Sequence, residues 1–230
     1  VRPVPFESMR SYLTYDPNRG AIRFDELSLS SDMVRVNAHG EAFIGSLSQG
    51  LPEEFLVQLT LNEFRANPRN LEDDPVALER SYADFRLKLD PFELDLGQLV
   101  VRQNGNQIVL DGHLATEGEN WAYALNGHMD EVVPESVLAL WPKSFKHKLR
   151  KWIDQNIYKA TLHDIDLAVR SKGAAPPEVY VDFQFRDVDI KAVKTMPPVR
   201  DGIGFGVLKD HQLHITAEAG YVEADQGGRM

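Results

Sequence analysis

The feature of the sequence that most constrains the fold is a strict alternation of apolar and polar residues. In one stretch every second position is apolar, at Val179, Val181, Phe183 and Phe185. A second stretch has the same alternation at Phe55, Val57, Leu59 and Leu61. A period of two is the period of a β-strand with one apolar and one polar face. Strands that keep one face in water belong to antiparallel sheets.

Short turn-forming sequences separate these strand-like stretches. They are rich in the Gly, Asn, Asp and Ser residues that favour tight turns. The clearest are Ser30-Ser31-Asp32, Asn104-Gly105-Asn106, Glu117-Gly118-Glu119-Asn120 and Lys209-Asp210-His211. Strands joined in this way pair as hairpins with their neighbours in the sequence. We therefore expect a mainly β protein, built as an extended antiparallel meander of about ten strands.

A weak internal repeat supports this expectation. When the sequence is aligned with itself so that Leu27 matches Leu99, other apolar residues also match apolar residues, and one glycine matches another. The matched pairs are Leu27 and Leu99, Leu29 and Val101, Val36 and Ile108, Ala38 and Leu110, Gly40 and Gly112, and Ala42 and Leu114. Repeats of this kind bury their apolar faces against neighbouring units, which makes such a sheet extensible.

Composition and charge argue against several functional classes. The chain has 230 residues, of which 43% are hydrophobic, enough for one or two ordered domains. Its net charge of −10 repels phosphate backbones, so we expect no nucleic-acid partner. It contains no cysteine, and so no disulfide, thiolate metal site or cysteine nucleophile.

The sequence carries none of the common catalytic motifs. It has no nucleophile elbow, phosphate-binding loop, zincin helix or EF-hand loop. The nearest candidate, Gly202-Ile203-Gly204-Phe205-Gly206, lacks the strand before it and the helix after it that dinucleotide binding requires. It indicates instead a glycine-rich entry into a strand. We therefore expect no enzyme activity, no catalytic residue, no cofactor and no metal site.

Two stretches depart from the alternation. Residues 68–84 are polar, and Asp74-Pro75 within them is typical of a helix start, which predicts a short helix or an ordered loop. Residues 143–158 predict one amphipathic helix, whose apolar side holds Phe145, Leu149, Trp152 and Ile153. Its polar side is rich in lysine, a pattern found in helices that contact anionic lipids. An apolar arc is more often core, which favours packing of this helix on the sheet.

The second half of the chain resembles a known family. The residues that carry the resemblance are Leu140-Trp141-Pro142, then Leu149 to Ile157, then Leu162 to Leu167, followed by Val181 to Ile190, Met196 to Val199 and Gly202 to Gly204. Together they resemble the AsmA-like proteins of Gram-negative envelopes, in particular the YhdP-like members with the DUF3971 region and, more distantly, the TamB-like members. One departure is Lys159-Ala160, where the family often has a glycine soon after the helix.

The resemblance implies two continuous parts, a β-repeat segment at 1–139 and a DUF3971-like helix and strand segment at 140–230. It also implies a curved, groove-like sheet in the periplasm that carries phospholipid between the inner and outer membranes for outer-membrane biogenesis. The expected groove lining is Phe55, Val57, Leu59, Leu61, Ile108, Leu110, Val179, Val181, Phe183 and Phe185.

The chain begins at Val1 and ends in a polar, glycine-containing tail, from which we expect a fragment of a longer polypeptide. An inner-membrane anchor, and any contact with a membrane surface, would then lie in the remainder of that polypeptide. The alternative function is a structural β-scaffold for envelope assembly, with a closed core and no lipid. The two hypotheses differ in whether the apolar strand faces meet one another or line an open trough.

Overall fold

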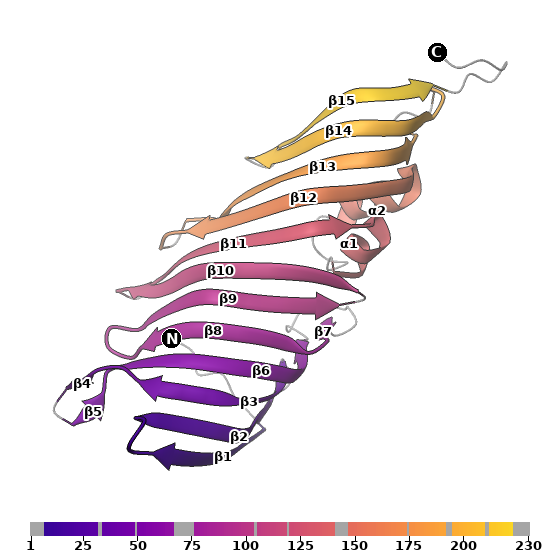
Figure 1. The fold of residues 1–230 in the computed structure, drawn as a ribbon. Helices are drawn as coiled ribbons and strands as arrows, with labels where there is room; N and C mark the ends of the chain where they lie inside the picture. The colour runs from indigo at the N-terminus through magenta and orange to yellow at the C-terminus, as the bar shows by residue number, and fades with distance from the viewer. Residues whose placement is uncertain are drawn as a thin grey trace. The chain divides into compact units, whose positions relative to one another are not determined.

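A computed structural model describes residues 7–31, 34–48, 50–66, 76–103, 105–118, 120–140, 147–173, 175–191, 195–209 and 212–222. Strands make up most of these residues, which confirms the expectation of a mainly β protein (Figure 1). The strands of the first half are β1 (Ser8–Asp16), β2 (Ala21–Ser30), β3 (Val34–Ile44), β4 (Leu47–Ser48), β5 (Leu51–Pro52), β6 (Glu54–Ala66), β7 (Val76–Leu78), β8 (Ser81–Lys88) and β9 (Glu93–Gln103). The second half adds β10 (Asn106–Glu117), β11 (Asn120–Val132), β12 (Ile157–Ser171), β13 (Glu178–Ile190), β14 (Val199–Lys209) and β15 (Gln212–Val222).

One antiparallel sheet of 13 strands takes in all of these except the small hairpin of β4 and β5. Its order follows the chain, β1-β2-β3-β6-β8-β9-β10-β11-β12-β13-β14-β15, and β7 pairs with β6. The expected meander is therefore present, with more strands than the roughly ten expected. The surplus includes the three short strands β4, β5 and β7, which are too brief to show an alternation in the sequence.

The internal repeat appears in the register of the strands. In the first copy Phe24 of β2 pairs with Gly40 of β3, and the register shifts between this pair and the next. In the second copy Leu96 of β9 pairs with Gly112 of β10, again beside a register shift. The shift that lays Leu27 on Leu99 also lays Phe24 on Leu96 and Gly40 on Gly112. The repeat therefore includes the β-bulge as well as the apolar positions.

The strands before these hairpins extend the repeat. Leu13 of β1 pairs with Phe24, and the register shifts just before Leu13. Its equivalent under the same shift is Phe85 of β8, which pairs with Leu96, and the register shifts just before Phe85. The repeating unit thus has four strands, β1-β2-β3-β6 in the first copy and β8-β9-β10-β11 in the second.

A third copy follows in β12-β13-β14-β15. Phe185 of β13 pairs with Gly204 of β14, and the register again shifts before the next pair, Val188 and Gly202. The glycine has a shared reason. A methyl group on Gly40, Gly112 or Gly204 would lie 2.0, 2.4 or 2.0 Å from a carbonyl oxygen of the following strand. Only glycine permits this close approach of neighbouring backbones.

Two helices lie between β11 and β12, α1 (Pro134–Leu140) and α2 (His147–Asn156). The expected helix at 143–158 corresponds to α2, and its residues 143–146 lie outside the described residues. Its expected end needs correction, because Ile157 and Tyr158 belong to strand β12. The helix α1 was not expected, because its seven residues are too few to show a helical period. No described helix is both long and apolar enough to cross a membrane.

The expected short helix or loop at 68–84 needs correction where it is described. Residues 76–78 and 81–84 belong to the strands β7 and β8, which both pair with β6. Residues 68–75, with the expected helix start at Asp74-Pro75, lie outside the described residues. Residues 76–78 are Val, Ala and Leu, and pairing with the long strand β6 outweighs the polar composition of the stretch as a whole, because β-propensity depends on context.

The chain divides into two compact units. Unit 1 contains residues 1–70, 74–127 and 169–178, and unit 2 contains residues 71–73, 128–168 and 179–230. This division differs from the sequence-based one at 139 and 140, since it assigns parts of β11 and β12 to each unit. The two units are described separately below.

Candidate functional site

One face of the sheet in unit 1 is apolar across neighbouring strands, and we call it the apolar face of unit 1. Val57 of β6 lies between Ala42 of β3 and Phe85 of β8. Phe85 in turn lies beside Leu96 of β9. Residues two positions apart share a face, so the register fixes which side chains this face holds. It holds all six expected lining residues of unit 1, Phe55, Val57, Leu59, Leu61, Ile108 and Leu110.

Most side chains on this face remain partly exposed. Val57 retains only 8% of its exposure, whereas Phe55, Leu59, Leu61, Ile108 and Leu110 are half-buried. The buried hydrophobic residues of the described part of unit 1 are small, namely Ala21, Ala38, Ala42, Val57, Ala83 and Val101. In the described residues the largest fully buried side chain is that of Ser81. A closed core buries large aliphatic and aromatic side chains instead.

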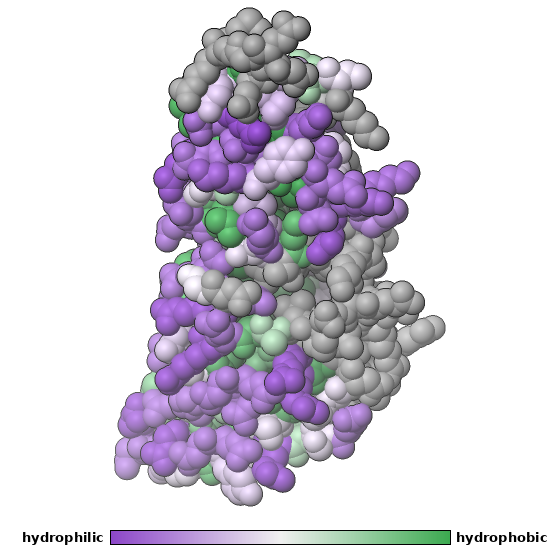
Figure 2. Space-filling model, turned by 90° about the vertical axis from the view of Figure 1, so that its right-hand side faces the viewer, coloured by the Kyte–Doolittle hydropathy of each residue, from purple (hydrophilic) through white to green (hydrophobic). Residues whose placement is uncertain are grey.

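The described elements of unit 1 form no second layer over this face. They are strands of the one sheet and the hairpin of β4 and β5, and both described helices lie in unit 2. Figure 2 shows, on the side it faces, hydrophobic patches between hydrophilic residues. The apolar face of unit 1 is therefore a partly exposed hydrophobic surface across neighbouring strands.

The lining residues expected in unit 2 lie together on β13, but their surroundings differ. Phe183 pairs with Gly206 and Phe185 pairs with Gly204, both on β14. A methyl group on these glycines would lie 2.4 Å from Cζ of Phe183 and 2.7 Å from Cζ of Phe185. The two rings therefore lie across the bare glycine backbone of the next strand. We call this surface the aromatic–glycine face of unit 2.

This aromatic–glycine face includes a small buried cluster. Phe185 retains 7% of its exposure and packs with Val188 and with Ala160 of β12. Phe183 and Leu162 are partly buried against the cluster. At the other end of β13, Val181 is half-buried and Val179 is exposed. The glycine-rich segment noted in the sequence is strand β14, and its glycines make room for these rings.

The helix residues expected to pack on the sheet are only partly described. Trp152 and Ile153 of α2 are half-buried. Phe145 lies outside the described residues, as does the side chain of Leu149. The side chain of Arg150 donates a hydrogen bond of 3.1 Å to the carbonyl oxygen of Leu138, which joins α2 to α1. At the end of α2, Asn156 Nδ2 donates to the carbonyl oxygen of Trp152 at 2.7 Å.

Several residues of the apolar face were not predicted from the sequence. Leu27 and Leu99 share the face with Phe24 and Leu96, although each lies three residues later in its strand. In a regular strand, two residues that are three positions apart point to opposite faces. The β-bulge between them adds one residue and so returns the second side chain to the same face. The internal repeat was the sequence signal that could have predicted these residues, because the spacing of Phe24 and Leu27 recurs in Leu96 and Leu99.

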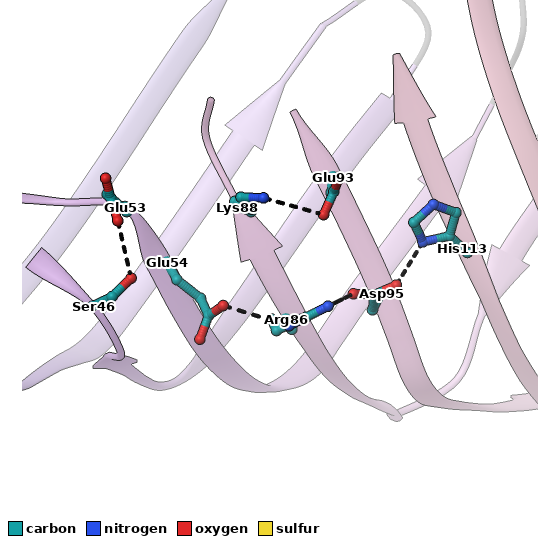
Figure 3. A network of polar contacts seen from close by, with 8 residues as sticks. All are labelled: Ser46, Glu53, Glu54, Arg86, Lys88, Glu93, Asp95 and His113. Atoms are coloured by element: carbon teal, nitrogen blue, oxygen red, sulfur yellow. Dashed lines mark hydrogen bonds and ion pairs between the residues drawn. The ribbon is translucent and has the colours of Figure 1, made fainter. Parts of the chain in front are cut away.

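The opposite, polar face of unit 1 carries a network of charged side chains across four strands, shown in Figure 3. Arg86 of β8 contacts Asp95 of β9 and lies 3.5 Å from Oε2 of Glu54 on β6. Asp95 Oδ1 lies 2.5 Å from Nδ1 of His113 on β10. Opposite charges on adjacent strands stabilise the register. Two further contacts in Figure 3 are the pair of Lys88 and Glu93 at 3.7 Å and the hydrogen bond from Ser46 to Glu53 at 3.5 Å.

The electrostatics of this network fit a structural role. Hydrogen bonds from Arg86, and then from His113, hold the pKa of Asp95 below its ordinary value. The same bond to Asp95 raises the pKa of Arg86. The side chains of all three groups remain substantially exposed, at 46% for Arg86, 35% for Asp95 and 47% for His113. The described residues hold no cluster of His, Asp and Glu that could bind a metal ion.

A similar contact occurs on the polar side of unit 2. His128 Nδ1 lies 2.8 Å from Oδ1 of Asp166, and Nε2 lies 3.3 Å from Oδ1 of Asp130. The hydrogen bond with Asp166 is the main reason that the pKa of His128 is raised. On the same strand as this histidine, Glu131 contacts Arg186 of β13. These pairs also connect strands of the sheet across its water-facing side.

The candidate functional site is therefore the apolar face of unit 1, defined by register and partial exposure. Its half-buried aliphatic and aromatic side chains offer hydrophobic contact. Comparison with known proteins found no relative: no family model, no curated protein and no solved structure matches the chain.

Proposed function

We propose that the apolar face of unit 1 binds lipid acyl chains, and that the chain is a segment of a periplasmic β-groove that conducts phospholipid between the inner and outer membranes. The observation that carries this proposal is the partial exposure of the aliphatic and aromatic side chains on that face. The resemblance to the AsmA-like family supports the compartment, the inner-membrane anchor outside this chain and the role in outer-membrane biogenesis.

The size of the hydrophobic effect fits a lipid ligand. Burial of each methylene group contributes about 0.8 kcal/mol, so an acyl chain of about fifteen carbons gains on the order of 10 kcal/mol when fully covered. A single sheet covers an acyl chain on one side only, so the gain in binding free energy is reduced in proportion to the area that stays in water. Incomplete coverage lets a lipid remain bound and still move along the strands.

The polar face supports the same function. Its cross-strand ion pairs, such as Arg86 with Asp95, keep one side of the sheet in water. A sheet with one wet face and one oily face separates acyl chains from the aqueous periplasm. No reactive group is needed for this role, because transfer along a groove breaks no covalent bond.

The experiment that tests the proposal is native mass spectrometry of the purified chain, to detect co-purifying phospholipid. The test variant is Leu59→Glu, which places a charge on the half-buried apolar face between Gly40 and Ala83. We expect the variant to fold, since water still reaches this position, and to lose most of its lipid. The matched control is Thr60→Glu, which adds the same charge on the polar face between His39 and Tyr82 and should keep the lipid.

A folded Leu59→Glu protein that retains its full complement of lipid would refute the lipid groove at this strand. Failure of Leu59→Glu to fold would favour the scaffold alternative, because an unpaired carboxylate in a closed core costs several kcal/mol. One observation favours that alternative locally. In unit 2 the rings of Phe183 and Phe185 lie over glycines of the neighbouring strand β14, and Phe185 is buried. We therefore assign lipid binding to unit 1 and structural packing to the aromatic–glycine face.

A further inference from the structure

Two arginines share one aromatic ring on the polar face of unit 1. The guanidinium carbon of Arg80 lies 5.8 Å from the centroid of the Tyr82 ring, and that of Arg102 lies 5.7 Å from it. Tyr82 precedes Ala83, which lies on the apolar face, so the Tyr82 ring lies on the polar face. All three residues of this group are exposed. We call Arg80, Tyr82 and Arg102 the arginine–tyrosine cluster.

Both arginines approach Tyr82 from the same end of the strands. Arg80 precedes Tyr82 by two residues, just before β8 begins. Arg102 follows Val100, the partner of Tyr82 on β9, also by two residues. The two strands are antiparallel, so both steps lead in the same direction. There the backbone nitrogen of Glu79 donates a hydrogen bond of 3.0 Å to the carbonyl oxygen of Arg102, and the segments that carry the two arginines are adjacent.

The two positive charges lack the compensation that other arginines of unit 1 have. Four of these contact a carboxylate, namely Arg19, Arg23, Arg65 and Arg86. Among the described residues, Arg80 and Arg102 contact no carboxylate, and Asp84, the next polar-face residue of β8, forms no ion pair. The chain as a whole has a net charge of −10. Two neighbouring uncompensated charges therefore create a local attraction for anions in an acidic protein.

The cluster also offers hydrogen-bond donors. Nε of Arg102 donates to Oε1 of Gln107 on β10 at 3.2 Å, which orients the guanidinium and leaves its two terminal nitrogens for a ligand. The amide nitrogen of the exposed Gln107 is a further donor beside them. Arg80 forms no hydrogen bond with another residue that the structure describes, so all its donors remain for a ligand.

We propose that the arginine–tyrosine cluster binds a phosphate monoester. One guanidinium fork satisfies a carboxylate, whereas two suit the three oxygens and the charge of about −2 of a phosphate monoester. Cation–π contact with Tyr82 holds both planar groups beside one ring. Two sources supply such a ligand, the headgroup of a lipid such as phosphatidic acid and a soluble phosphate compound. The cluster lies on the polar face, so this proposal does not depend on lipid binding by the apolar face.

Titration with glycerol 3-phosphate tests the site by nuclear magnetic resonance, through the Nε–Hε signals of Arg80 and Arg102. We expect both signals to shift and to saturate, and sodium acetate at equal ionic strength to cause no saturable shift. Arg80→Gln and Arg102→Gln should each weaken binding by about tenfold, since each removes charge-assisted hydrogen bonds. Arg23→Gln is the matched control, because it removes the same charge from an arginine that pairs with Asp25 at 3.1 Å. It should bind as the wild type does.

Vesicle flotation separates the two sources of phosphate. Phosphatidic acid presents a monoester at a lipid surface, and phosphatidylglycerol presents a diester, so the two kinds of vesicle are prepared with equal surface charge. Preferential binding to phosphatidic acid that is lost in Arg80→Gln assigns the cluster to a lipid headgroup. Binding of glycerol 3-phosphate without this preference assigns it to a soluble compound. Leu59→Glu should leave the glycerol 3-phosphate titration unchanged, so this proposal and the lipid groove can fail separately.

Arg102→Lys provides a check on the geometry of the cluster. It keeps the positive charge but loses the planar fork, so it should bind more weakly than the wild type and more tightly than Arg102→Gln. Circular dichroism and melting curves identify any variant that fails to fold. Wild-type signals that do not shift with glycerol 3-phosphate, or that respond equally to acetate, would overturn the proposal. So would an affinity that stays unchanged in both folded glutamine variants.

Discussion

The apolar face of unit 1 and the aromatic–glycine face of unit 2 begin from the same repeat and end in different surfaces. Both have an apolar residue paired with glycine beside a β-bulge, as in Phe24 with Gly40 and Phe185 with Gly204. In unit 2, β14 has a second glycine in phase, Gly206, and rings cover both. In unit 1 the corresponding strand has Ala42, and aliphatic side chains stay half-exposed.

The difference shows that the residues of one strand decide whether the side chains of the neighbouring strand can lie flat over it. A strand with glycine at successive inward positions leaves space for the rings of its neighbour, which then lie along the sheet. A strand with alanine at the second of these positions, as β3 has at Ala42, leaves less space for a ring. The first arrangement removes apolar area from water within the sheet, and the second leaves it available to a ligand.

The largest effect that tests this comparison is expected from removal of a ring. Phe185→Ala should lower the free energy of unfolding by about 3–5 kcal/mol, because Phe185 is buried against Val188 and Ala160. The matched change in unit 1, Leu59→Ala, should cost only about 1–2 kcal/mol, since Leu59 stays half-exposed in the folded state. Chemical denaturation measures both. Equal losses would mean that the two faces are equally closed.

A somewhat smaller effect is expected from the glycines that permit close strand approach. Gly40→Ala and Gly204→Ala should each cost about 3 kcal/mol, because the new methyl group would lie 2.0 Å from a backbone carbonyl oxygen. Gly97→Ala is the control, since its methyl group would lie 3.5 Å from the carbonyl oxygen of Asp84, an ordinary contact. Thermal melting of the three variants compares them. A Gly204→Ala protein as stable as Gly97→Ala would contradict the shared role of these glycines.

At acidic pH the polar face of unit 1 should weaken. Asp95 has a lowered pKa in the folded state, so its contribution is present above its unfolded pKa of about 3.9 and is lost as pH falls through the folded value. The site is exposed, and the loss should stay below about 1 kcal/mol. Unfolding of the wild type and of Asp95→Asn between about pH 7 and about pH 3 measures it. The two proteins should converge in stability at the acidic end.

The contact at His128 in unit 2 should respond to pH in the opposite direction. Its pKa is raised, so its contribution is complete below the unfolded value of about 6.5 and is lost as pH rises through the folded value. Titration by nuclear magnetic resonance should show a raised pKa for His128, and Asp166→Asn should bring it back toward the ordinary value. An unchanged titration in Asp166→Asn would show that this aspartate does not set the pKa.

Much of the fold follows from the sequence alone. The alternation at Phe55 to Leu61 and at Val179 to Phe185 predicted strands with one apolar face, and both are strands. The match of Leu27 to Leu99 predicted equivalent hairpins, and the registers of β2 with β3 and of β9 with β10 confirm them. These features are local or nearly local. A period of two depends only on neighbouring residues, and a hairpin depends only on one turn.

The tertiary structure decided the rest. It placed Leu27 and Leu99 on the apolar face by means of bulges that an alternation rule does not anticipate. It placed residues 76–78 and 81–84, within a stretch that is polar as a whole, in strands, because β6 was available for pairing. It also separated two faces with similar patterns, one with half-exposed aliphatic side chains and one with rings over the glycines of the next strand. Alternation states which side chains share a face, but coverage of that face depends on the neighbouring strand, and so on contacts between residues far apart in the chain.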